Sequence, residues 1–480
     1  MAMAPDFRHG RPARPHPSIL VAGLLLTLGC GSLSAQTLKV TSGDDDFDGT
    51  CNSHCSLRDA IHVANQAGTQ VHIRLGPGDY RITRYSAPDA NGYPEDEQNN
   101  LSGDFDVHGD IVITGSGRTT RLMGTSPDLT AGIPALPAYY RGRLFDVHPG
   151  ARLTLKGMDL LRGLAIDEGG ALKNRGDTVL RDVDLYRNGV LVPEGYGLLP
   201  ANQKLTGVGG AISNHGSLLI HRSYLVRNLN DAYDHSATFG SAIYNTGQLL
   251  MRDSALVANE AALIYQDYGG DALVNLGQAD IARSWFSDNN SGQEGLTAVF
   301  NAGELKFSNS TLFLFQGLVN AAPAQATLIH VTSIARIQNH GRMRVRNSVF
   351  AGSPHLFDWD IPEDCFSSPN ADFQYSGLLT STPDDGYSSC PADIYADYAQ
   401  VFQRLLYPRD EGDAASYPKN SIDWARALGK KGSYLRLRAG GEAIDAGIGS
   451  CASHDQLARP RPADGNGDGV ANCDLGAYEY

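Results

Sequence analysis

Hydrophobic and polar positions alternate in a unit that recurs six times between Gly169 and Gly352. Each copy carries small residues, an aliphatic residue, the motif Asn-x-Gly, and then a segment in which every second residue is apolar. When the copies are aligned on that Asn, the position six residues later is always apolar: Leu180, Ile220, Met251, Ile281, Phe307 and Val345. A period of two predicts a β-strand rather than a helix.

A second set of apolar residues follows five positions later: Leu185, Leu225, Leu256, Phe286, Leu312 and Phe350. This offset requires a corner between two short strands. A unit of this length cannot bury its own apolar face, so copies must stack on one another. Because they run in the same direction, we expect parallel sheets and an all-β, right-handed parallel β-helix, or solenoid, over residues 76–355. The intervals of 40, 31, 30, 26 and 38 residues between the asparagines are assigned to loops that bulge outward.

The repeated asparagines predict a structural ladder at one corner of the solenoid. They are Asn174, Asn214, Asn245, Asn275, Asn301 and Asn339. Stacked amides can pass hydrogen bonds from coil to coil and satisfy turn backbone that would otherwise be buried unpaired. We expect the Gly two residues after each Asn to supply a permissive corner conformation.

Composition places the chain among globular proteins and narrows its partners. It has 480 residues, 41% of them hydrophobic and 19% charged, enough for a solenoid core with a cap at each end. The net charge of −14 argues against general nucleic-acid binding, which requires a basic footprint.

The first 35 residues resemble a secretory signal peptide. Arginines precede an apolar run from Ile19 to Leu28, which is too short to span a membrane. We expect cleavage after Ala35 and an extracellular or periplasmic location. The alternative is an outer-membrane lipoprotein modified at Cys30, although Thr27 stands where such a signal usually has Leu.

Six further cysteines fit an oxidising compartment. Six cysteines allow fifteen connectivities, but proximity in sequence favours three local pairs: Cys51 with Cys55, Cys365 with Cys390, and Cys451 with Cys473. Metal binding is the weaker alternative, because no His accompanies these pairs at zinc-ligand spacing.

The segment 36–75 predicts a cap for the first coil. Leu38 to Thr41 has the pattern of a strand, and Ser56 with Asp59 forms a capping box for a helix that runs to Ala67. The apolar side of this helix would cover the exposed strand edges of the first coil.

Both ends of the chain resemble known segments of secreted bacterial β-helix proteins. The stretch Cys55-Ser56-Leu57-Arg58-Asp59-Ala60 resembles the CSLREA domain, with Asp59 in place of its Glu, and that domain implies a structural role. Residues 441–480, with Ala443 to Gly447 and Asp474 to Glu479, resemble the closing segment of choice-of-anchor Q proteins. Between them, residues 356–440 predict an acidic, Tyr-rich excursion with the final coils.

Two alternating acidic motifs suggest calcium loops, the only cofactor that we expect. One comprises Asp44, Asp46 and Asp48, and the other Asp464, Asn466 and Asp468, each followed by Gly. Oxygen ligands at alternate positions before a Gly can wrap a calcium ion. Neither motif has the Glu that ends a complete EF-hand loop, so a shortened loop competes with a solvated turn.

Outward-facing positions of the repeat suggest a ligand surface. Seven residues after the Asn stand Arg181, His221, Arg252 and Arg346, and Tyr186 and Tyr224 lie close in sequence. Arg forks match carboxylates, so these residues predict a cationic groove for an acidic glycan. One position further, Asp182, Arg222, Asp253 and Arg283 alternate in sign and should pair along the stack.

The same alternation weakens the case for catalysis. Asp182 and Asp253 could flank a glycosidic bond, but Arg222 between them would keep both ionised. We therefore predict a secreted or cell-envelope, non-enzymatic β-helix protein that binds a polysaccharide or cell-surface glycan. The alternatives are a polysaccharide lyase or glycoside hydrolase acting on an acidic polymer, and a structural adhesin subunit.

Overall fold

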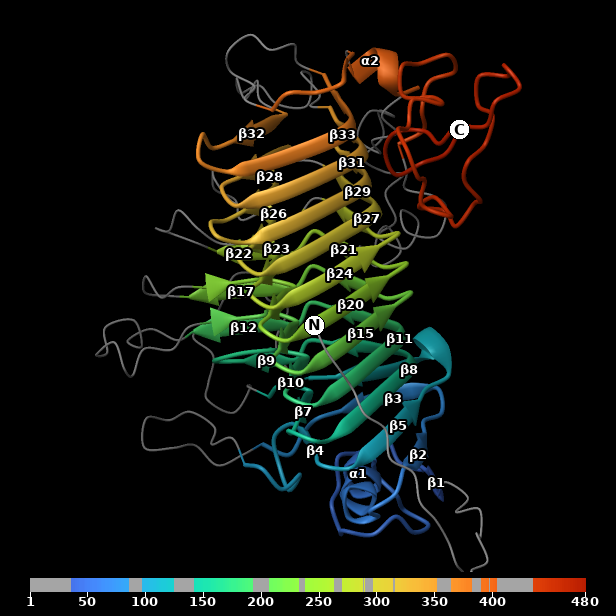
Figure 1. Cartoon of the computed structure of the whole chain (residues 1–480). Helices are drawn as coiled ribbons and strands as arrows, with labels where there is room; N and C mark the ends of the chain where they lie inside the picture. The colour runs from blue at the N-terminus through green and yellow to red at the C-terminus, as the bar shows by residue number, and fades with distance from the viewer. Residues whose placement is uncertain are drawn as a thin grey trace, which may run out of the picture. The chain divides into compact units, whose positions relative to one another are not determined.

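The computed structural model describes residues 36–85, 97–124, 142–192, 207–232, 238–262, 270–287, 289, 297–313, 316–351, 364–381, 390–396, 398–403 and 435–480. The predicted signal peptide, residues 1–35 with Cys30, lies outside these residues. The described chain is a right-handed parallel β-helix, as the repeat predicted, with strands of successive coils lying side by side (Figure 1).

The largest sheet, here called the long sheet, has 18 strands. They are β1 (Gln36–Lys39), β2 (Val71–Arg74), β3 (Gly78–Arg81), β5 (Asp110–Thr114), β6 (Thr120–Met123), β8 (Arg152–Leu161), β11 (Asp177–Tyr186), β15 (Ser217–His221), β16 (Tyr224–Val226), β20 (Gln248–Arg252), β21 (Ala255–Val257), β24 (Gln278–Ala282), β25 (Trp285–Ser287), β27 (Glu304–Phe313), β29 (Gln325–Ser333), β31 (Arg342–Phe350), β33 (Asp372–Thr380) and β34 (Ile394–Tyr395).

Three smaller sheets complete the coils. A ten-stranded sheet comprises β4 (Phe105–Val107), β7 (Phe145–Val147), β10 (Leu172–Asn174), β14 (Ile212–Asn214), β19 (Ile243–Asn245), β23 (Gly270–Asn275), β26 (Thr297–Asn301), β28 (Gln316–Asn320), β30 (Arg336–Asn339) and β32 (Cys365–Ser367). The others comprise β9 (Leu164–Ala165), β12 (Gly189–Val192), β17 (Leu229–Ala232) and β22 (Glu260–Ala262), and β13 (Gly207–Val208) with β18 (Thr238–Phe239). The helical segments are α1 (Leu57–Gln66), α2 (Tyr398–Val401) and the short 3-10 helix η1 (Gly117–Thr119).

The apolar positions of the repeat form one continuous core. Residues six and eleven positions after each ladder Asn belong to the same buried cluster, and most of them are fully buried. Register pairs such as Ile220 with Met251 and Leu225 with Leu256 join equivalent positions of neighbouring coils. The stack therefore buries the stripe that a single coil would leave in water.

The predicted asparagine ladder is present and fully buried. Asn214 donates to Oδ1 of Asn245 at 2.6 Å, and Asn245 donates to Oδ1 of Asn275 at 2.7 Å. The same amide of Asn245 also donates to the backbone oxygen of Gln278 at 3.1 Å. Each side chain thus joins its own coil to the next one.

The structure contains a coil and a ladder that the sequence analysis missed. Asn320 lies between Asn301 and Asn339, hydrogen-bonded to both at 2.8 Å, so the interval of 38 residues holds two coils instead of one long loop. A second buried ladder joins Asn188, Asn228, Asn259 and Asn289. These residues end the first four copies of the repeat.

The expected role of the corner glycines was wrong. Gly216, Gly247, Gly277 and Gly303 are not among the residues with positive φ. A Cβ atom on Gly247 would instead stand 2.1 Å from the carbonyl oxygen of Gly216 in the preceding coil. These positions require Gly because the coils approach closely, and not because of a left-handed backbone.

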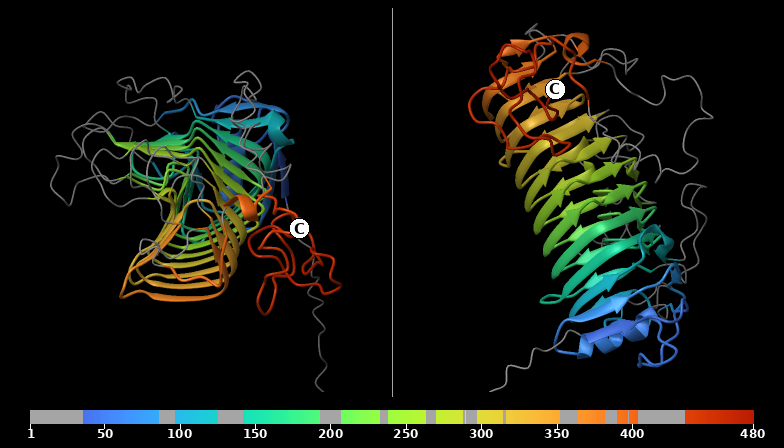
Figure 2. Two further views of the ribbon diagram at one scale, coloured as in Figure 1. Left: turned by 90° about the horizontal axis from the view of Figure 1, so that it is seen from above. Right: turned by 90° about the vertical axis from the view of Figure 1, so that its right-hand side faces the viewer.

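The two ends carry the expected cap and disulfides. Helix α1 has the capping box of Ser56 and Asp59, and it packs against β2, β4 and β5. All three expected cysteine pairs are bonded: Cys51–Cys55, Cys365–Cys390 and Cys451–Cys473. The segment after Ala443 lies beside the last coils (Figure 2), where Ala477 donates its N–H to Thr332 and Ile448 donates to Asn347.

Candidate functional site

The outer face of the long sheet is the candidate functional site. Side chains alternate between the core and solvent along each strand, so positions three, five and seven after the ladder Asn point outward. We name these three positions the amide row, the middle row and the cationic row; in the coil of Asn320 the register places the same rows five, seven and nine residues after the Asn. Strand register aligns each row across the sheet.

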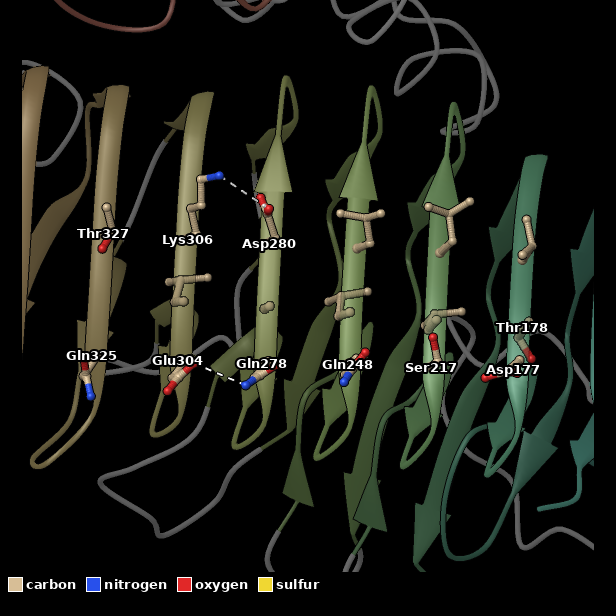
Figure 3. Close-up of a pocket in the computed structure, with 17 residues that line it drawn as sticks. Asp177, Thr178, Ser217, Gln248, Gln278, Asp280, Glu304, Lys306, Gln325 and Thr327 are labelled. Carbon is tan, nitrogen blue, oxygen red and sulfur yellow. Dashed lines mark hydrogen bonds and ion pairs between the residues drawn. The ribbon is translucent and has the colours of Figure 1, made fainter. Parts of the chain in front are cut away.

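A shallow groove of about 640 Å³ crosses six adjacent strands of this face, from β11 to β29 (Figure 3). The amide row supplies Asp177, Ser217, Gln248, Gln278, Glu304 and Gln325, and the middle row supplies Val179, Leu219, Leu250, Asp280, Lys306 and Thr327. The groove is open to solvent along its length and runs across the strands. Its shape therefore suits a chain-like ligand better than a compact one.

The middle row changes character along the groove. Leu250 is 38% exposed, and Val179 and Leu219 lie in line with it on neighbouring strands. Two strands further on, Lys306 lies 3.6 Å from Asp280. One end of the groove is therefore apolar and the other is charged.

The amide row offers donors and acceptors on successive strands. Gln278 donates to Glu304 at 3.3 Å, and Gln248 and Ser217 continue the row with an amide and a hydroxyl (Figure 3). Side-chain amides both donate and accept hydrogen bonds, as sugar hydroxyls do. A regular row of such groups can bind a polymer of hydroxylated units.

Three of the four predicted cationic residues lie together. Arg181, His221 and Arg252 are register partners on β11, β15 and β20. His221 Nε2 lies 3.4 Å from Asp253, and Arg252 lies 3.0 Å from Asp280.

The cationic row extends in a direction that the sequence analysis missed. Register continues from Arg181 to Lys156 on β8, across Thr114 on β5, and then to Arg74 on β2 and Lys39 on β1. These coils lack the Asn-x-Gly signal, because Val107 and Val147 occupy the position of the ladder Asn. Without that signal the earlier coils could not be aligned with the repeat.

The remaining predicted ligand residues do not join this surface. Arg346 lies four strands from Arg252 along the row, and its guanidinium donates to Ser450 of the C-terminal segment at 3.1 Å. Tyr224 is only 5% exposed, and burial raises the pKa of its hydroxyl. Tyr186 is half-buried beyond the corner, with Arg187 over its ring at 5.0 Å. The prediction that these tyrosines offer stacking faces next to the cationic residues was wrong, since a corner separates them.

The alternating corner residues form the expected ion pairs. Arg222 donates to both oxygens of Asp182 at 2.9 and 2.7 Å, and Arg283 to both oxygens of Asp253 at 2.6 and 2.7 Å. Hydrogen bonding to these carboxylates raises the pKa of both arginines. Asp253 is thus held by Arg283 and not, as expected, by Arg222.

The two acidic motifs differ in their local geometry. Asp44 and Asp46 lie close to His54, whereas Asp48 accepts hydrogen bonds from Thr50, which lower its pKa. In the other motif, Asp464 accepts from the backbone of Gly467 and Gly469, Asn466 from that of Asp468, and Asp468 from that of Val470. Calcium binding stays a prediction at both places.

In a second cluster of metal-ligating residue types, both ring nitrogens of His148 are already hydrogen-bonded. Asp106, His108 and His148 lie together near the N-terminal coils. Nε2 of His148 is 2.8 Å from Asp106, and its Nδ1 is 3.2 Å from Arg175. Since the arginine can only donate, His148 is fixed as the neutral tautomer with its proton on Nε2. Asp106, His148 and Arg175 thus form a hydrogen-bond network that joins neighbouring coils.

The comparisons with known proteins assign the chain to no family. No family model matches it, and no curated protein matches it. A crystal structure of the pectate lyase Pel9A is similar over 93% of this chain and 97% of the other, with 15% sequence identity and a TM-score of 0.45. That score supports no inference about activity. The resemblances of the two ends to CSLREA and choice-of-anchor Q segments stay predictions.

Proposed function

We propose that this is a secreted, non-enzymatic β-helix protein that binds an extended glycan along the outer face of its long sheet. The single observation that carries this proposal is the groove across β11, β15, β20, β24, β27 and β29, with its aligned amide row. Stacked coils place register-equivalent side chains about 4.8 Å apart, so the surface has a regular spacing along which a polysaccharide can bind.

The chemistry of the groove suits sugar rings. Val179, Leu219 and Leu250 present apolar surface that can pack against the C–H faces of a sugar. Gln248 and Gln278 beside them can exchange hydrogen bonds with ring hydroxyls.

Two of the three carboxylates that line the groove lie beside cations, which supports binding over catalysis; the third, Glu304, accepts a hydrogen bond from Gln278. Asp280 is paired with Arg252 and Lys306, and Asp177 lies 3.5 Å from Arg152. A general acid must hold a proton at working pH, and an adjacent cation opposes this. At the corner, the bidentate ion pairs of Asp182 and Asp253 oppose protonation of these two carboxylates in the same way.

Secretion is supported by the ends of the chain. Three disulfides fit an oxidising compartment. Residues 1–35 carry the pattern of a signal peptide. Among the described residues, no helix has the length and hydrophobicity needed to cross a membrane.

A glycan array followed by titration calorimetry tests the proposal. The double variant Gln248→Ala with Gln278→Ala should weaken binding of the best glycan about tenfold, because two hydrogen bonds are lost. The matched control is Gln374→Ala, an exposed glutamine of β33 outside the groove, which should bind as the parent does. The proposal would be overturned if no glycan on the array bound, or if the double variant bound the best glycan as tightly as the parent protein does. Release of new reducing or unsaturated ends that is lost in Arg252→Ala would identify an enzyme instead.

A further inference from the structure

We infer that the glycan is a polyanion, and that the cationic row of the first coils binds its acidic groups. This inference rests on the proposed glycan binding and names its substrate class. Lys39, Arg74, Lys156 and Arg181 occupy one row on β1, β2, β8 and β11. At about 4.8 Å per strand, the row from Lys39 to Arg181 measures roughly 19 Å.

These four cations are exposed, and the described part of the chain gives them no partner. Within the part of the chain that the structure describes, none of their side chains forms an ion pair or a hydrogen bond, and all four are exposed. Lys39 is the direct register neighbour of Arg74, and Lys156 is that of Arg181. Like charges placed directly opposite one another on adjacent strands are destabilising. The fold therefore retains an electrostatic repulsion that a bound anion would reduce.

The corner residues next to the cationic row differ from it, because their charges are paired. One residue beyond Arg181, at the corner, Asp182 is paired with Arg222, and Asp253 with Arg283. Acid and base alternate there from coil to coil. Just one position away, the cationic row holds only basic and neutral residues from β1 to β11. In a chain of net charge −14, this concentration of unpaired positive charge is a specific feature of the surface.

The acidic side chains of the same strands are buried or bonded to residues outside the row. The middle row beside it holds Thr37, His72, Val112, Thr154 and Val179. The nearest acid, Asp182, directly follows Arg181 and is held by Arg222 through both carboxylate oxygens. Asp159 and Asp184, three residues beyond Lys156 and Arg181, are buried. On the other side of the row, Asp110 and Asp177 lie four residues away, or about 13 Å. Each already has a partner, Gln70 for Asp110 and Arg152 for Asp177. A ligand carboxylate or sulfate would therefore meet the cations without competition.

The row is continuous with the groove. Asp177 and Val179 of β11 line one end of the groove, and Arg181 lies on the same strand. A polymer lying across the strands could contact the amide row and the middle row on β11 to β29, and the cationic row on β1 to β11. Arginine forks bind carboxylate and sulfate oxygens in pairs, whereas lysine supplies a point charge.

The charge balance favours an acidic glycan over a nucleic acid. Nucleic-acid surfaces carry a broad basic footprint that neutralises phosphates on several sides. Here a single row of cations is flanked by a neutral row and followed by a groove rich in amides and hydroxyls. Such a surface matches a polymer that carries both acidic groups and hydroxyls.

Titration calorimetry with matched oligosaccharides tests the inference. A uronate oligomer should bind at least tenfold more tightly than a neutral glucan oligomer of the same length, and added salt should weaken only the uronate. The double variant Lys156→Gln with Arg181→Gln should lose about tenfold in uronate affinity and nothing in glucan affinity. The control is Arg344→Gln with Arg436→Gln, two exposed arginines outside the cationic row and outside the lining of the groove, which should leave both affinities unchanged.

Each other outcome overturns a definite part of the account. Equal binding of both oligomers, or unchanged uronate affinity in the double variant, would overturn the polyanion inference and leave the groove proposal standing. Binding of neither oligomer by the parent protein would overturn both. Tighter binding of a single-stranded oligonucleotide than of the uronate would assign the row to nucleic acid and overturn the glycan class.

Discussion

At the scale of the residue, the ladder shows why asparagine recurs at one position. Its amide has two donors and one acceptor oxygen. The side-chain nitrogen of Asn245 donates to Asn275 and to the backbone oxygen of Gln278, and its side-chain oxygen accepts from Asn214. Asp would lack the donors, and an aliphatic residue would leave buried backbone oxygens unpaired. The sequence alone predicted this role because the residue, its spacing and its burial all follow from the repeat.

We expect Asn245→Ala to lower the free energy of unfolding by about 3 kcal/mol. The substitution leaves the donor of Asn214, the acceptor of Asn275 and a strand carbonyl without partners, each costing about 1–3 kcal/mol before relaxation. Chemical denaturation measures the change. Gln374→Ala, exposed on β33, is the control and should change stability by less than 0.5 kcal/mol. A similarly small loss in Asn245→Ala would show that water or relaxation replaces the ladder.

The residues of the candidate site were predictable only in part. Arg181, His221 and Arg252 could be aligned because each follows a ladder asparagine at a fixed distance. Lys39, Arg74 and Lys156 could not, since their coils lack that marker. Tyr224 was misplaced because closeness in sequence does not reveal a corner, and the positive φ of Arg222 makes that corner.

At the scale of the element, each coil is a set of short strands joined by corners of fixed geometry. The strands were predictable from their period of two. The coil that contains Asn320 was not, because Ala322 replaces the Gly that marks the other copies. The chain there follows a different corner, with a cis peptide bond between Ala322 and Pro323. A change of corner chemistry hides a coil from sequence analysis even when its strands keep their register.

Gly247→Ala tests the close approach of neighbouring corners. The added Cβ would meet the carbonyl oxygen of Gly216, which is held in the stack, so we expect a loss of about 2–3 kcal/mol in the free energy of unfolding. Gly142→Ala is the control, because nothing lies within 4 Å of its Cβ and its φ is not positive. Thermal and chemical denaturation of both variants give the comparison. Equal stability of the two would mean that the corners can separate at little cost.

At the scale of the whole molecule, stacking turns single residues into rows. One glutamine or one arginine on a coil recognises little, but aligned copies form a surface with the period of the strands. Although the chain is acidic, four exposed cations, Lys39, Arg74, Lys156 and Arg181, share one such row next to the groove. Function at this scale depends on the register between coils, so it could not be deduced from any single motif.

The most direct test of the account is calorimetric titration with a length series of the glycan that binds best. Because the groove crosses six strands, or roughly 24 Å, affinity should rise with each added sugar until the oligomer reaches at least that length. A level affinity from monosaccharide to long oligomer would place recognition in a local pocket and contradict an extended binding face.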